Sequence, residues 1–216
     1  NAVTMTITDT NTDATYYPVF TDGAGTGKTL NVDVGTTPIS VNPNTGDFNV
    51  VDTLKIDQNK VAVGKNAGIT TQGVNSVAVG NAAGHISQGS NAVAIGNSAG
   101  YTDQSANTVA IGNTAGLTSQ GVESVAIGYI AGLNNQGTKS IAVGRLAGQI
   151  TQGTSAVAIG NLAGQTSQGT SAVAIGVNAG NSGQLSNTVA IGIQAGQTTQ
   201  GPSAVAVGYL AGQTSQ

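Results

Sequence analysis

The chain of 216 residues has a formal net charge of −3, with 7% charged residues and no Cys. The absence of Cys excludes a disulfide framework, a Cys-based zinc site and a thiol nucleophile, and so small a net charge gives no electrostatic footprint for nucleic acid. No apolar run reaches the roughly 18 residues of a membrane-spanning helix, so we expect no membrane insertion.

The first sixty residues differ in composition from the rest of the chain. They hold 10 of the 15 charged residues and both Phe residues. Alternating and β-branched stretches predict short strands, and a Pro-containing segment predicts a turn. The strands are expected at Ala2–Thr8, Tyr16–Phe20, Leu30–Val34 and Phe48–Leu54, with the turn at Asn42–Gly46. We therefore predict that residues 1–60 form a small β module, either a cap or an adapter.

One segment of this module comes close to a phosphate-binding loop. Asp22–Thr29 (DGAGTGKT) ends in Gly-Lys-Thr, but Asp22 stands where that motif needs its first Gly. A carboxylate at this place would repel phosphate, and the segment that follows alternates as a strand rather than opening a helix. We interpret the segment as a Gly-rich turn, and we expect no nucleotide and no other cofactor.

The same module carries a resemblance to a known group of proteins. Ala14–Gly23 (ATYYPVFTDG), Leu30–Asp33 and Val41–Gly46 (VNPNTG) resemble a module of fibre and tail proteins of tailed phages and of surface proteins of giant viruses. In those proteins the module precedes fibre repeats. The resemblance implies a structural component of a virion fibre.

From Val61 onward the sequence repeats every 16 residues, and each copy begins with Val-Ala-Ile/Val-Gly or, at Ile141, with Ile in place of the first Val. Counted from this residue, position 2 and position 7 are always Ala, positions 4 and 8 are always Gly, and position 12 is always Gln. So much Gly is incompatible with a helix. Short β-branched stretches bounded by Gly, in unbroken register, predict an all-β fold, a parallel β-solenoid of ten 16-residue coils over residues 61–216. Ten coils give a rod of roughly 45–50 Å.

Residues at one position of the repeat are expected to stack in columns along the rod. We predict that Val or Ile at positions 1 and 3 face the coil interior as apolar ladders, that Gly forms the corners, and that Gln forms a ladder of side-chain amides. In the third and fourth coils these ladder residues are Val93, Ile95, Gly96, Ala99, Gly100, Gln104, Val109, Ile111, Gly112 and Gln120. The Ala at position 2 is then expected to face outward and to pack against another chain, at Ala94, Ala110, Ala126 and Ala158 among others.

So thin a coil would gain stability from a partner, and we predict self-association as a homotrimer. The last copy, Val205–Gln216, is as regular as any other and would expose an unpaired edge, so we expect either that the natural chain continues beyond Gln216 or that another subunit docks there. Docking would make a head-to-tail filament, which is the alternative to the homotrimer. The repeat array is similar to the heads of trimeric autotransporter adhesins such as the Yersinia adhesin. Those heads are trimers of left-handed parallel β-rolls with a shorter repeat, so the similarity implies a trimer and an adhesive role.

Candidate chemistry in the array is sparse. Asp103 and Glu123 are its only acids and fall in different columns, so they do not form the carboxylate pair of a glycosidase. His85 is the only His and has no second metal ligand in its column. Tyr101, Tyr129 and Tyr209 are candidates for stacking on a sugar or another receptor group, although packing between chains would explain them as well.

We therefore expect a non-enzymatic structural fibre protein, located on a virion or outside the cell, that serves attachment to a host receptor or glycan. One alternative is a bacterial adhesin head or an extracellular filament subunit. The third hypothesis is ice binding, through Thr and Ser at positions 10 and 11 of the repeat.

Overall fold

A computed structural model describes residues 20–21, 30–31, 40–42, 47–49 and 59–215. The chain divides into two compact units, Asn1–Lys55 and Ile56–Gln216. The boundary predicted from the sequence, between residues 60 and 61, lies five residues later. The predicted strand at Ala2–Thr8 and the Gly-rich turn at Asp22–Thr29 lie outside the described residues.

The described residues of the first unit form two short antiparallel strand pairs. Strand β1 (Phe20–Thr21) pairs with β2 (Leu30–Asn31), and β3 (Ser40–Asn42) pairs with β4 (Asp47–Asn49). The β3–β4 pair flanks the predicted turn, as expected for a hairpin. Only the first part of the strand predicted at Leu30–Val34 falls within the described residues.

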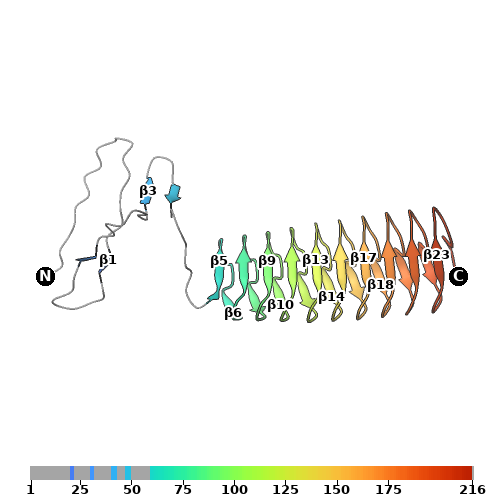
Figure 1. The fold of residues 1–216 in the computed structure, drawn as a ribbon, viewed down its shortest axis with the longest axis horizontal. Helices are drawn as coiled ribbons and strands as arrows, with labels where there is room; N and C mark the ends of the chain where they lie inside the picture. Colours follow the sequence, from blue (N-terminus) through green and yellow to red (C-terminus); the bar gives the residue numbers. More distant parts are fainter. Residues whose placement is uncertain (1–19, 22–29, 32–39, 43–46, 50–58, 216) are drawn as a thin grey trace. The chain divides into compact units, whose positions relative to one another are not determined.

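The second unit is a parallel β-solenoid in which each 16-residue repeat makes one turn (Figure 1). A ten-stranded sheet is built from positions 1–3 of successive repeats, and a nine-stranded sheet from positions 10–12. The ten strands are β5 (Val61–Val63), β7 (Val77–Val79), β9 (Val93–Ile95), β11 (Val109–Ile111), β13 (Val125–Ile127), β15 (Ile141–Val143), β17 (Val157–Ile159), β19 (Val173–Ile175), β21 (Val189–Ile191) and β23 (Val205–Val207). The nine are β6 (Thr70–Gln72), β8 (Ile86–Gln88), β10 (Thr102–Gln104), β12 (Thr118–Gln120), β14 (Asn134–Gln136), β16 (Ile150–Gln152), β18 (Thr166–Gln168), β20 (Ser182–Gln184) and β22 (Thr198–Gln200).

The register of both sheets is the sequence repeat. In the ten-stranded sheet Val93 pairs with Val109, and Ile95 with Ile111, in parallel orientation. Residues of one column therefore stack directly on one another, and the predicted solenoid and its predicted columns are confirmed.

The direction in which the columns face is the reverse of the prediction. From the second coil to the ninth, the Ala residues at positions 2 and 7 are fully buried within a single chain; Ala94, Ala99, Ala110, Ala126 and Ala158 are each 0% exposed. In the terminal coils Ala62 is exposed, and Ala67 and Ala211 are half-buried. The Val and Ile residues at positions 1 and 3 point away from the interior. The prediction that the position-2 Ala residues contact another chain is therefore wrong, and so is the prediction that the Val and Ile ladders fill the coil.

Size explains this reversal. The coil is so flat that an added methyl group on Gly132 would lie 3.1 Å from the Cβ of Ala126 and 2.8 Å from Oε1 of Gln136. No branched side chain fits between two walls this close. The interior therefore takes Ala at positions 2 and 7, a small residue at position 16, and the flat amide of Gln at position 12.

The invariant Gly residues form the corners, as predicted. Gly112 has φ of 129°, and a Cβ there would lie 2.5 Å from the carbonyl oxygen of Gly128 in the next coil. Gly96 and Gly100 also have positive φ, 129° and 54°. Three further positions of the repeat, 6, 11 and 15, also adopt the left-handed conformation, with residues other than Gly except at Gly183; Asn66, Thr151 and Lys139 are examples.

The Gln column is buried and forms two kinds of hydrogen bond. Nε2 of Gln104 donates to the carbonyl of Val93 at 2.9 Å, and Nε2 of Gln120 donates to that of Val109 at 2.8 Å, so each amide bridges the two walls of its own coil. Bonds between successive amides, at 2.9–3.3 Å, run from Gln136 to Gln200. The predicted amide ladder is therefore present in the C-terminal half of the array, whereas Oε1 of Gln104 and Gln120 has no partner within the described residues.

Candidate interaction surface

One side of the ten-stranded sheet is an aliphatic face on the outside of the solenoid. It consists of the outward side chains at positions 1 and 3 of the strands of the ten-stranded sheet, and we call it the Val/Ile face. Its side chains are half-buried or exposed: Ile95 and Ile159 are 38% exposed, and Val205 is 63% exposed. No polar or charged residue interrupts either column. The face is thus a continuous apolar surface formed by one side of one sheet.

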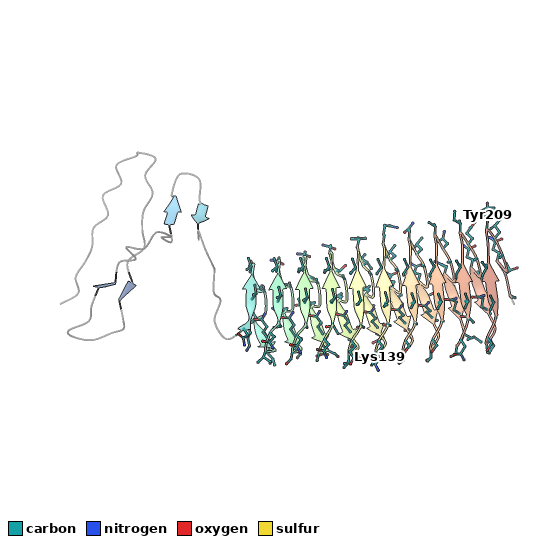
Figure 2. The ribbon with its side chains drawn as sticks, in the orientation of Figure 1. Lys139 and Tyr209 are labelled. Atoms are coloured by element: carbon teal, nitrogen blue, oxygen red, sulfur yellow. The ribbon has the colours of Figure 1, made fainter. Side chains whose placement is uncertain are left out.

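The turns on the two edges of the coils carry more polar groups. Figure 2 labels Tyr209 on the upper edge and Lys139 on the lower edge. Nζ of Lys139 lies 3.9 Å from Oε2 of Glu123, and both side chains are more than half exposed. An exposed pair of this kind contributes little to stability.

The three Tyr residues proposed as ligand contacts are not brought together. Tyr129 and Tyr209 lie at position 5 and are 49% and 72% exposed, but five coils separate them, about 24 Å. Tyr101 lies at position 9, where its half-buried ring stacks on His85 with centroids 4.9 Å apart and planes 9° from parallel. Tyr101 and His85 occupy the same position in adjacent coils, so stacking between neighbouring turns explains both residues.

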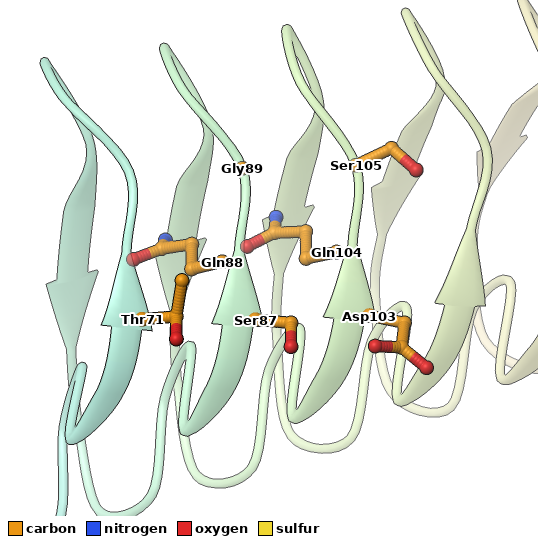
Figure 3. Close-up of a pocket in the computed structure, with 7 residues that line it drawn as sticks. All are labelled: Thr71, Ser87, Gln88, Gly89, Asp103, Gln104 and Ser105. Atoms are coloured by element: carbon orange, nitrogen blue, oxygen red, sulfur yellow. The ribbon is translucent and has the colours of Figure 1, made fainter.

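A shallow groove of about 350 Å³ lies on the other sheet (Figure 3). Thr71, Ser87 and Asp103 form one row along it, at position 11, and the groove ends at Ser105, which replaces the usual Gly at position 13. Within residues 59–215 and the short strands before them, no three His, Cys, Asp or Glu residues come together as a metal site would require. Asp103 and Glu123 do not share a column, as the sequence analysis stated.

The ice-binding hypothesis invokes positions 10 and 11, which lie on the strands of the nine-stranded sheet. Thr102 pairs with Thr118, and Gln104 with Gln120, but the residue between them, at position 11, is outside the pairing. Asp103 and Ser119, which occupy that place, have φ of 53° and 55°. The strand leaves the regular β conformation at position 11 in every coil, so the side chains at positions 10 and 11 do not alternate as they would in a flat strand.

In comparisons with known proteins, no protein family, curated protein or solved structure matches this chain. Among the described residues, no helix is long and apolar enough to cross a membrane.

Sequence reasoning missed the Val/Ile face as a surface. The signal that could have revealed it is the restriction of positions 2 and 7 to Ala in every copy, while position 3 varies between Val and Ile. A position that accepts only a methyl group is enclosed by its own chain at least as readily as by a partner.

Proposed function

We propose that this chain is a non-enzymatic structural component of an extracellular or virion-surface fibre, in which the solenoid is a rigid rod of fixed length. The observation that carries the proposal is the unbroken stack of 16-residue turns, joined by two parallel sheets over the whole array. A one-dimensional stack of identical turns sets a length and a direction, which is what a fibre segment requires.

Hydrogen bonds around each turn support the rigidity of the rod. Besides the bonds within the sheets, backbone N–H groups donate to carbonyl oxygens of the next turn. The donor and acceptor pairs are, for example, Val109 and Ser124 at 3.0 Å, Gly116 and Ala131 at 2.9 Å, and Gly121 and Gln136 at 2.8 Å. These bonds lie on several sides of the coil and recur in nearly every repeat. Bending the rod in any direction would therefore stretch one row of them.

The assignment to a virion rests on the resemblance of the first sixty residues to fibre and tail modules. A homotrimer, a bound receptor or glycan, and a role in host attachment are parts of the same proposal. A bacterial adhesin head or filament subunit is the alternative, since the array is similar to such heads. Both functions use the solenoid as a spacer.

The spacer role is tested by changing the number of turns. Inserting a second copy of residues 77–204, eight repeats, should lengthen the rod by about 38 Å without changing its width. Negative-stain electron microscopy of both proteins measures this difference. A compact particle, or a length that does not grow with the insertion, would refute the spacer role.

The location is tested with an antibody against the array, applied to particles and cells of the organism that encodes the chain. Immunogold labelling on the outside of virus particles is the expected result. Labelling of a bacterial cell surface instead would replace the virion assignment with the adhesin alternative.

A further inference from the structure

The Val/Ile face has no covering element in the described part of the chain, although every side chain on it is apolar. Ten strands about 4.8 Å apart make it about 43 Å long, and with a width of about 12 Å it covers roughly 500 Å². Soluble proteins rarely leave a contiguous apolar area of more than a few hundred Å² open to water unless it binds something.

We propose that the Val/Ile face of one copy of this chain binds the Val/Ile face of a second copy; in the homotrimer proposed above, three such faces meet around a common axis. This inference rests on the proposed fibre function and names the surface through which its copies associate. It replaces the Ala columns, which are enclosed within each chain, as the place of contact.

A second copy fits this face better than any other occupant because both surfaces have the same repeat. Side chains recur at every turn along the rod in columns 1 and 3, so those of one copy can interdigitate with those of another over the full length without losing register. A surface with another spacing would match only over a few turns. The pair would bury roughly 1,000 Å² in total, which reaches the lower range of specific interfaces.

The chemistry of the face also suits burial. Positions 1 and 3 carry only Val and Ile, so pairing would leave no polar side chain without a partner. The opposite sheet differs: its outward column at position 10 includes Thr118, Asn134 and Ser182. The two faces therefore provide a test surface and a matched control surface on the same rod.

The test compares two double variants of the full chain with the unchanged protein. Ile127→Lys with Ile159→Lys places two charges on the Val/Ile face, and Thr118→Lys with Ser182→Lys places two charges on the opposite sheet. Circular dichroism verifies that each is folded, and light scattering coupled to size-exclusion chromatography gives the mass. Ile127→Thr with Ile159→Thr keeps the β-branched shape and serves if the first variant does not fold.

We expect the unchanged chain and the Thr118/Ser182 variant to have a mass of at least twice 21.0 kDa. The mass of the variant with Lys at positions 127 and 159 should fall to 21.0 kDa. The Thr variant should associate at least about tenfold more weakly than the unchanged chain. Equal loss of mass in both Lys variants, or retained mass in both variants of the Val/Ile face, would overturn the inference.

A monomeric unchanged chain at high micromolar concentration would also overturn the inference, and so would a monomer that sediments with phosphatidylcholine vesicles, since lipid would then be the occupant. Neither result would touch the rod and its length dependence, so failure of this inference is distinguishable from failure of the proposed function.

Discussion

Replacing Ala126 by Leu tests the closeness of the two walls of the coil. Ala126 is 0% exposed and stacks on Ala110 and Ala142 in the neighbouring turns. Across the coil lies Gly132, where an added methyl group would be only 3.1 Å from the Cβ of Ala126. The three extra carbon atoms of Leu therefore have no free space to enter, and the turn must open to accept them.

The expected cost follows from this lack of space. Overfilling a well-packed core typically lowers the free energy of unfolding by 1–3 kcal/mol. Three added carbons between two close walls place this variant at the upper end of the range, about 3 kcal/mol. For a domain of this size, each kcal/mol lowers the melting temperature by about 2–4 °C, so we expect a fall of about 6–12 °C. Ile127→Leu, one residue further along the same strand, keeps its volume and lies on the outside, so it should cost less than about 1 kcal/mol.

Thermal unfolding followed by circular dichroism compares the two variants with the unchanged chain. An unchanged melting temperature for the Ala126 variant, together with a large loss for the Ile127 variant, would refute the arrangement with Ala inside and Ile outside.

Three further substitutions test other parts of the solenoid, each by thermal unfolding against the unchanged chain. Gly112→Ala should be among the most destabilising changes, because its Cβ would collide with the backbone of the next turn at a φ of 129°; a loss of less than about 1 kcal/mol would contradict the corner geometry. Gln152→Leu removes the 2.7 Å hydrogen bond to the carbonyl of Ile141 and interrupts the amide ladder, so we expect a loss of about 2–3 kcal/mol in the free energy of unfolding. An unchanged melting temperature would show that the amide does not stabilise the coil. Thr151→Asn should instead stabilise the fold by about 0.5–1 kcal/mol and raise the melting temperature, since Thr151 is exposed at a φ of 54° that Asn tolerates better. Thr154 is exposed but has no positive φ, so Thr154→Asn is the control and should change the melting temperature little.

The period and register of the solenoid could be predicted from the sequence because they depend on recurrence alone. Ala, Gly and Gln each recur at fixed positions of a 16-residue repeat, and only a stack of equal turns keeps every column in an equivalent environment. The pairing of Val109 with Val125 follows directly from this. No knowledge of side-chain direction was needed.

Side-chain direction was predicted wrongly because all three residues of a strand such as Val125–Ile127 are apolar. Alternation of apolar and polar residues normally marks the buried face, and this strand has none. The deciding quantity is the distance between the two walls of the coil, which depends on tertiary structure. The irregular strand at Thr118–Gln120 could not be predicted either. Its middle residue, Ser119, has a left-handed conformation although it is not a Gly.

The central claim, that Ala lines the interior and Ile lies outside, is tested most directly by thiol labelling. The chain has no Cys, so Ala158→Cys and Ile159→Cys each introduce a single thiol at neighbouring positions of one strand. At nanomolar chain concentration, where copies are apart, a maleimide should modify the thiol at position 159 at least about a hundredfold faster than the thiol at position 158, which only local opening exposes. Equal rates, or faster labelling at position 158, would contradict the account.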